Sequence, residues 1–260
     1  MGWAQGGRAP LSNPAPLRHS SAMSTPAADR PPLFARRLDG RGRRRAGPPI
    51  WDPRTWKLLF SPAGIPAFVL TALSTVVLVA QGAHGGPGPW GVSGGALGQG
   101  GWHTLVTHMV SHAGVVHLLM NVSVLLPLTP LVMVRLGVGP AGWARFVVLF
   151  AGAGLAGAAL FLAVNPDGPV MVGASGAIFG LWGAVGRIRA DGSMAPLWSQ
   201  RVGDEVLLAG WINLVMFGVS YAMIRSGGGG LGWEAHIGGF LFGLLAMPWL
   251  APRTPPPATC

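Results

Sequence analysis

The apolar residues of this chain come in blocks of about twenty, the length that a helix needs to cross the hydrocarbon core of a bilayer. Half of the 260 residues are hydrophobic and only 10% are charged, against roughly 25% in a typical soluble domain. We therefore expect an all-α, polytopic membrane protein. Six spans are predicted, at about residues 64–83, 113–135, 143–164, 170–188, 205–224 and 231–251.

The positions of the cationic residues predict how these spans cross the membrane. Arginines flank the second and fourth connections and follow the sixth span, whereas the opposite connections contain only Arg225. Lys and Arg near the ends of spans are retained on the cytoplasmic side. We therefore expect both termini in the cytoplasm. The bias toward Ala, Gly, Pro and Arg favours a bacterial plasma membrane as the location.

The N-terminal part of the chain differs from the rest in composition. Residues 1–57 are rich in Pro, Arg and Ala with little apolar periodicity, which is typical of a disordered segment. The net charge of +10 comes largely from arginines gathered here, so it favours anionic membrane lipid as a partner rather than nucleic acid. We predict a cytoplasmic tail at 1–57, a membrane domain at 58–252 and a short tail at 253–260. Met23 offers an alternative start.

The single cysteine of the chain is its last residue, Cys260. No intrachain disulfide is possible, so packing alone must hold the fold. No cofactor is expected.

Three polar residues lie at a similar depth in the predicted topology. His117, Ser175 and His236 fall near the outer ends of the second, fourth and sixth spans. An ionisable residue inside a membrane costs about 2.5–3.5 kcal/mol on insertion scales, so such residues usually line a polar cavity or carry out chemistry. The pattern predicts one shared site.

Ser175 lies in the sequence Gly173-Ala174-Ser175-Gly176. One interpretation is helix packing, because small residues four apart, such as Gly176 and Gly180, let two helices approach closely. The sixth span carries a second row of small residues that includes Gly239, and His236 is next to its first member. If the two rows face each other, a serine hydroxyl lies beside an imidazole. That pair is what nucleophilic catalysis requires, with His236 as the base.

His117 and Asn121 are spaced four residues apart, so both project from one face of the second span. Taken alone they would form a polar clamp between helices, worth about 0.6–2 kcal/mol. Beside a serine and a histidine at the same depth, we interpret them as donors to the oxyanion of an acyl-transfer reaction.

Further histidines and a glycine run surround these residues. His103, His108 and His112 precede the second span, but no Cys, Asp or Glu accompanies them, so we predict no metal site. Hydrogen bonding or cavity polarity is the expected role of these imidazoles. Residues 227–230 are all glycine and form either a plain flexible linker or the hinge of a lid above the site.

Three ordered motifs resemble the signatures of rhomboid intramembrane serine proteases over about residues 60–251. They are His112 with His117-Leu118-Leu119-Met120-Asn121, then Gly173-Ala174-Ser175-Gly176, then Ala235-His236-Ile237-Gly238-Gly239 with Gly243. The resemblance implies a six-helix bundle with Ser175 as nucleophile and His236 as base. It also implies that His117, Asn121 and the Ser175 amide hold the oxyanion, and that the substrates are transmembrane proteins.

Two alternatives and one departure accompany this resemblance. Many members of the family carry Trp-Arg in the first external connection, whereas Trp102 is followed here by His103. A non-proteolytic rhomboid-like protein that binds transmembrane clients is the main alternative, although such proteins are expected to lack the serine or the histidine. A transporter is the second, but the sequence lacks an inverted repeat and intramembrane carboxylates for ion coupling.

Overall fold

The computed structural model describes residues 1–2, 53–189, 191–226 and 230–254. Within these ranges the chain is helical, and its only β pairings are two isolated bridges. The all-α prediction is confirmed. The elements are α1 (Pro53–Leu59), η3 (Pro62–Gly64), α2 (Ile65–Ala83), η4 (Gly88–Trp90), α3 (Gly94–Gly98), α4 (Thr104–Thr107), α5 (Val115–Leu136), α6 (Pro140–Val164), α7 (Ser175–Gly186), α8 (Gln200–Arg225) and α9 (Trp233–Leu250).

The ends of the long helices follow local chemistry. Gly137, with φ of 97°, stops α5, because glycine enters the left-handed region without a Cβ penalty. Pro140 opens α6, where its fixed φ suits a first helical turn and no N–H is needed. The Ser199 side chain accepts a hydrogen bond from the Val202 amide and caps the start of α8.

Helix α7 packs against α5, α6 and α9. Leu181 and Ala184 on this helix have no exposed surface. Glycines make the α7–α9 contact possible, because a Cβ on Gly239 would overlap the carbonyl oxygen of Gly176. The predicted close approach of the fourth and sixth spans is therefore confirmed.

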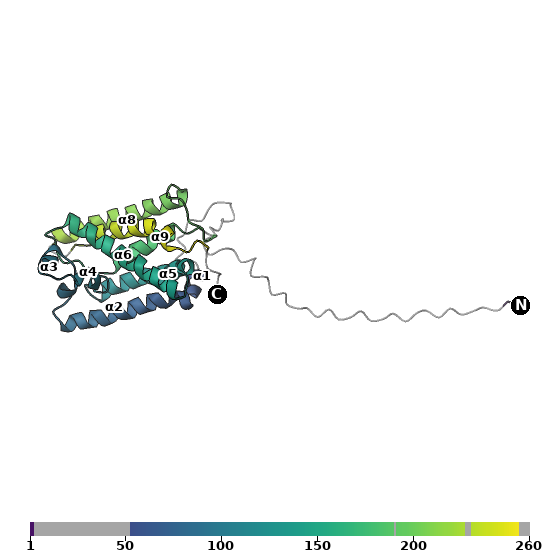
Figure 1. Ribbon diagram of the computed structural model, residues 1–260, viewed down its shortest axis with the longest axis horizontal. Coiled ribbons are helices and arrows are strands. Elements are labelled where there is room, and N and C mark those ends of the chain that lie inside the picture. Colours follow the sequence, from purple (N-terminus) through teal and green to yellow (C-terminus); the bar gives the residue numbers. More distant parts are fainter. Residues whose placement is uncertain (3–52, 190, 227–229, 255–260) are drawn as a thin grey trace. The chain divides into compact units, whose positions relative to one another are not determined.

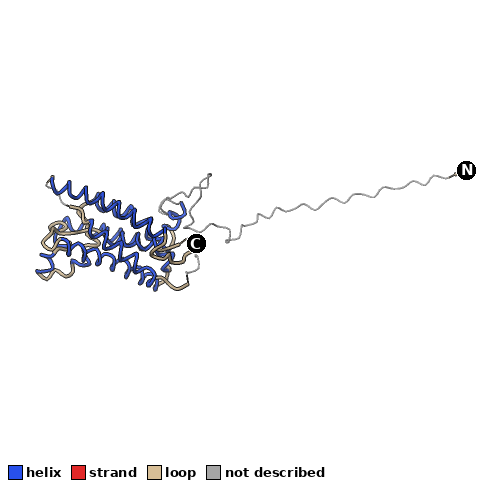
Figure 2. Tube along the Cα trace, turned by 90° about the horizontal axis from the view of Figure 1, so that it is seen from above, coloured by secondary structure: helices blue, strands red, loops and turns tan. Residues whose placement is uncertain are grey.

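Helices α2 and α8 lie on opposite sides of the helical domain, with α2 against α5 and α8 against α9 (Figure 1). Only 17% of the apolar window of α8 is buried. Its side chains at Leu207 and Trp211 are 74% and 64% exposed. An apolar helix with so little protein around it suits a lipid environment. Figure 2 shows the same helices joined by loops.

Among the described residues, four helical segments are long and apolar enough to cross a membrane, namely Pro62–Ala83, Val115–Leu136, Pro140–Val164 and Gln200–Arg225. They correspond to the first, second, third and fifth predicted spans. The fourth span, predicted at 170–188, is shorter, because α7 begins at Ser175 and has 12 residues. Twelve helical residues rise roughly 18 Å, less than the hydrocarbon thickness of about 30 Å. The total of six crossings therefore stays a prediction.

The missing helical turns of the fourth span are replaced by extended chain. Met171 pairs with Val92 through two backbone hydrogen bonds of 3.0 and 2.8 Å. Gly173 then takes a φ of 127°, which no right-handed helix contains. The apolar run from residue 170 looks helical in sequence, but pairing with a distant loop holds its first residues out of the helix.

The boundary of the predicted tail also moves. Residues 53–57, assigned to the tail, belong to α1, and α1 packs against α5 through buried side chains that include Leu59. Burial of this apolar surface offsets the entropy of ordering the helix. Residues 3–52 of the predicted N-terminal tail, residues 255–260 and the glycines at 227–229 lie outside the described residues.

Candidate active site

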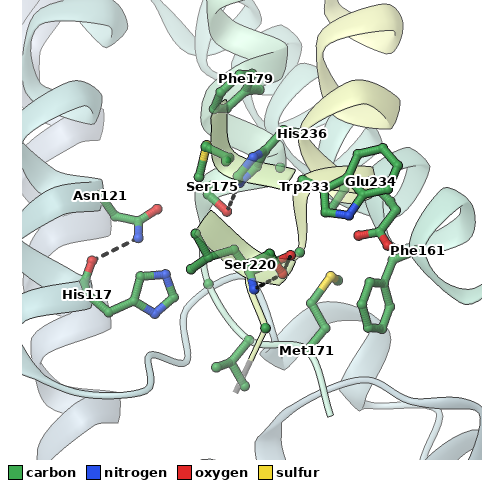
Figure 3. A pocket seen from close by; sticks show the side chains of 18 of the residues that line it. His117, Asn121, Phe161, Met171, Ser175, Phe179, Ser220, Trp233, Glu234 and His236 are labelled. Carbon is green, nitrogen blue, oxygen red and sulfur yellow. Dashed lines mark hydrogen bonds between the residues drawn. The ribbon is translucent and has the colours of Figure 1, made fainter. Parts of the chain in front are cut away.

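The Ser175 hydroxyl and the His236 imidazole are in direct contact. Ser175 is the first residue of α7 and His236 is the fourth of α9, and the distance from Oγ to Nε2 is 2.8 Å (Figure 3). The glycine contacts between α7 and α9 bring the two helix starts together. The two residues are 61 positions apart in the chain, so only the tertiary packing of these helices joins the hydroxyl to the imidazole.

An aromatic ring holds the imidazole in place. Phe179, one turn after Ser175 on α7, stacks on His236 with ring centroids 4.3 Å apart and planes inclined by 8°. His236 is 3% exposed, and its Nδ1 has no hydrogen-bond partner among the described residues. The imidazole is thus oriented by stacking, whereas a serine-protease triad would place a carboxylate at Nδ1. Sequence reasoning missed Phe179, although its i+4 spacing from Ser175 was the available signal.

The backbone before the serine brings His117 into the site. Gly173 donates its N–H to the carbonyl of His108 at 2.8 Å. A Cβ placed on Gly173 would lie 2.8 Å from Cε1 of His117 and 3.8 Å from the Ser175 hydroxyl oxygen. Glycine is required here twice, for the positive φ and for the close approach of the His117 ring.

The candidate oxyanion residues share one wall of the site (Figure 3). Asn121 Nδ2 donates to the His117 carbonyl at 2.9 Å, and this bond holds the amide on its own helix. The Ala113 N–H donates to Nδ1 of His117 at 3.4 Å. A ring nitrogen that accepts a hydrogen bond leaves the other nitrogen as the N–H donor in the neutral imidazole. This contact therefore favours Nε2 of His117 as a donor.

His112 lies behind His117, between α4 and α5. The two rings are 5.2 Å apart in an edge-to-face arrangement, and neither nitrogen of the buried His112 has a hydrogen-bond partner among the described residues. Burial, helped by the proximity of His117, lowers the pKa of His112 to about 4. The Gln81 side chain accepts from the His112 amide at 3.2 Å and donates to Ser111 at 2.9 Å, so α2 positions this loop.

His103 and His108, the other two histidines that precede α5 in the predicted cluster, have separate partners. Nδ1 of His108 lies 2.9 Å from the Thr104 carbonyl, and Nε2 of His103 lies 3.2 Å from the Pro89 carbonyl. Burial lowers the pKa of His108. Across the described residues, no three His, Cys, Asp or Glu side chains are arranged to hold a metal ion.

A cavity of about 1410 Å³ surrounds the dyad and is lined by residues of five helices, α5 to α9. Ser175, His236, His117 and Asn121 all line it, together with many apolar side chains. The described lining includes Glu205 and Glu234 but no Lys or Arg. A chamber of this size has room for several residues of an extended peptide, with Ser175 and His236 on its wall.

Sequence reasoning gave no role to Glu234, which lines the cavity. Glu234 is 6% exposed, and its Oε1 accepts a hydrogen bond from Asn165 at 2.9 Å. The available signal was the cost of a carboxylate at the end of an apolar span. Its partner, 69 residues away, could not be read from the sequence.

The chain is similar to known proteins over its helical domain. The family model of the Rhomboid domain matches residues 99–253. YdcA of Bacillus subtilis (strain 168), described as a candidate rhomboid protease, is 33% identical over 155 residues, which are 58% of this chain and 70% of YdcA.

A second relative is the rhomboid protease GluP of the same organism. It is 31% identical over 150 residues, which are 58% of this chain but 26% of GluP. Together with four helices able to span a bilayer, these matches identify an integral membrane protein. Because the family model covers more than half of its residues, the chain belongs to the rhomboid family.

Proposed function

We propose that this protein is an intramembrane serine endopeptidase that cleaves transmembrane proteins with a Ser175–His236 dyad. The observation that carries the proposal is the 2.8 Å contact between Ser175 Oγ and His236 Nε2 inside a large cavity. A serine hydroxyl is a weak nucleophile until an adjacent base takes its proton. Similarity to rhomboid proteases supports the same class of reaction.

In the proposed reaction, Ser175 Oγ attacks a substrate carbonyl carbon while His236 Nε2 accepts the hydroxyl proton. The imidazolium then gives this proton to the leaving amine as the peptide bond breaks. Water, deprotonated by His236, attacks the resulting ester, releases the second product and restores the serine. Stacking on Phe179 holds the imidazole ready in both steps.

Three N–H groups are proposed to stabilise the tetrahedral oxyanion. The Ser175 amide is among the first N–H groups of α7, which have no partner within their own helix. The bond from Ala113 to Nδ1 of His117 supports Nε2 as the second donor, and Asn121 Nδ2 is the third. Removing one such donor typically costs about 2.7–4 kcal/mol of transition-state stabilisation.

The proposal includes six crossings, with the membrane domain at 58–252 extended to residue 53 and both termini cytoplasmic. Support comes from guanidinium groups that bind backbone carbonyls at the end of the domain away from Ser175. Arg135 donates to Gly192 and Pro252, and Arg187 donates to Ala195 and Leu244. Arginines concentrated at one end mark the cytoplasmic side.

Cleavage of a reporter transmembrane substrate by the purified full chain in detergent tests the dyad. Wild type is expected to cut, whereas Ser175→Ala and His236→Ala are expected to lose at least about 10³-fold in kcat. Ser123→Ala is the matched control, because this exposed serine bonds only its own helix at Met120.

A fluorophosphonate probe gives a second readout that needs no chosen substrate. It is expected to label wild type and Ser123→Ala but not Ser175→Ala, since the reagent reacts with activated serines. If wild type neither cuts nor reacts, the dyad is inactive, and a client-binding rhomboid-like protein becomes the better description.

A further inference from the structure

Glu234 carries a carboxylate oxygen that nothing in the described structure satisfies. It is the second residue of α9, and it lines the cavity that contains Ser175 and His236. Oε1 accepts a hydrogen bond from Asn165 Nδ2, whereas Oε2 is buried and has no hydrogen-bond partner among the described residues. Figure 3 shows Glu234 next to Trp233 and Phe161, on the opposite side of the dyad from His117 and Asn121.

An anion in this position is costly without a positive partner. Taking a carboxylate out of water carries a penalty of several kcal/mol, even after the protein relaxes. One neutral amide compensates only part of that penalty. The described lining offers no Lys or Arg to compensate the remainder of the penalty. Buried charges in proteins are normally paired, so the missing partner is a group that enters the cavity.

The second carboxylate of the lining, Glu205, differs from Glu234 in its hydrogen bonding and in its position. Its Oε2 accepts a hydrogen bond from the Trp182 indole at 2.8 Å. It lies in the second turn of α8, whereas Glu234 lies at the start of α9 near the dyad. Of these two carboxylates, Glu234 alone combines an unpartnered oxygen with proximity to the reactive serine.

We propose that Glu234, oriented by Asn165, forms an acidic subsite that binds a lysine or arginine side chain of the substrate close to the scissile bond. This inference rests on the proposed protease function and adds a substrate class to it. The neighbouring Phe161 and Met171 belong to one apolar cluster and line the same cavity. They suit the methylene stem of such a side chain, with its charged head at the Glu234 carboxylate.

Helix geometry places this subsite beside the reacting atoms and not among them. Two residues of helix rise about 3 Å and turn about 200°, so Glu234 and His236 leave α9 in nearly opposite directions. The bound cation therefore comes from a residue a few positions from the cleaved bond. Glu234 is a specificity-determining residue in this scheme and takes no part in proton transfer.

A set of single-span reporter substrates tests the subsite on the full chain in a neutral detergent. They differ only in one residue, Lys, Gln or Glu, placed in turn at each of the four positions on either side of the cleaved bond. At one or more positions, wild type is expected to prefer Lys over Glu by about tenfold in kcat/KM, equal to about 1.4 kcal/mol.

Three variants separate the charge of Glu234 from its shape. Glu234→Gln keeps an acceptor for Asn165 and is expected to cut the Lys, Gln and Glu substrates at similar rates, because the charge that favours Lys is gone. Glu234→Lys is expected to reverse the preference. Glu205→Gln is the matched control and should retain the preference of wild type, because Glu205 already has the Trp182 partner.

Binding to the Ser175→Ala chain distinguishes failure of the subsite from failure of the protease function. Fluorescent single-span peptides with Lys are expected to bind this chain about tenfold more tightly than peptides with Glu, whether or not wild type cuts. Adding Glu234→Gln should remove the difference. Equal handling of Lys and Glu by wild type in both assays overturns the proposal, as does a preference that persists in Glu234→Gln.

Discussion

At the scale of single residues, the site depends on a glycine, Gly173, at a position where no residue with a Cβ fits. Gly173 combines a φ of 127° with a place directly against the His117 ring and close to the Ser175 hydroxyl. A Cβ there has to displace the ring that is proposed to hold the oxyanion. Gly173 therefore matters for activity more than for overall folding.

Gly173→Ala is expected to lower kcat/KM at least tenfold. The positive φ alone costs about 1–3 kcal/mol in a residue with a Cβ, and the displaced His117 ring adds to the loss. Enzyme kinetics and the thermal midpoint Tm check this. Gly98→Ala is the control, since a Cβ on Gly98 meets no atom within 4 Å. An unchanged kcat/KM in Gly173→Ala would contradict the placement of His117.

The buried His112 is expected to make stability depend on pH. Its pKa is about 4 in the folded chain against an ordinary value of 6.5. Between pH 4 and pH 6.5 the unfolded chain binds more protons than the folded chain. The contribution of neutral His112 to the stability of the fold is therefore complete above pH 6.5 and is lost as pH falls toward 4. At pH 5 the loss is about 2 kcal/mol.

Thermal unfolding measured from pH 7.5 to pH 5 checks this dependence. His112→Leu is expected to flatten the fall in Tm, whereas His84→Gln, at an exposed position, should leave the slope as it is in wild type. A slope unaltered in His112→Leu would show that other groups dominate.

At the scale of helices, backbone contact between α7 and α9 sets the distance between the Ser175 hydroxyl and the His236 imidazole. Carbonyl oxygens of Gly176 and Gly180 lie where Cβ atoms of Gly239 and Gly243 would be. Close packing of this kind uses small residues because lipid supplies no hydrophobic force to press helices together. The 2.8 Å contact between Ser175 and His236 at the helix starts depends on these glycine contacts.

Gly239→Leu is expected to abolish cleavage by forcing α7 and α9 apart. Overpacking costs about 1–3 kcal/mol in stability, and a displacement of about 1 Å at the reacting groups can cost about 10²-fold in rate. Gly210→Leu on α8 makes the same change where no atom lies within 4 Å, so it should keep wild-type turnover and Tm. Normal turnover of Gly239→Leu in the reporter assay would mean that the glycine contacts between α7 and α9 do not set the distance between Ser175 and His236.

At the scale of the whole domain, the two ends of the helices have different chemistry. One end holds Ser175 and His236. The other is joined by arginines that donate to backbone carbonyls left free where helices and loops end. Arg187 is 8% exposed and links the loop at Ala195 to α9 at Leu244.

Arg187→Met is expected to lower Tm by roughly 5–10 °C, since it removes hydrogen bonds to a charged group worth about 1.5–3 kcal/mol each. Residual activity below the new Tm should remain, because the change lies far from Ser175. Arg225→Met, at an exposed helix end, is the control and should leave Tm unaltered. Equal Tm values for Arg187→Met and wild type would contradict a structural role for this arginine.

The sequence by itself determined the all-helical membrane class and the family. Apolar blocks of spanning length are a local property, and so is the i, i+4 placement of His117 and Asn121 on one helix face. The row of small residues at Gly176 and Gly180 also indicated correctly which helix face packs closely, because only such residues permit backbone contact.

Tertiary structure decided what depends on residues far apart in the chain. The start of α7 at Ser175 follows from the pairing of Met171 with Val92, and the burial of Glu234 against Asn165 follows from the packing of α9 on α6. Hydropathy and spacing describe each helix by itself. They contain no information on which distant loop or amide fills the space beside it, and that choice shapes the cavity around the serine.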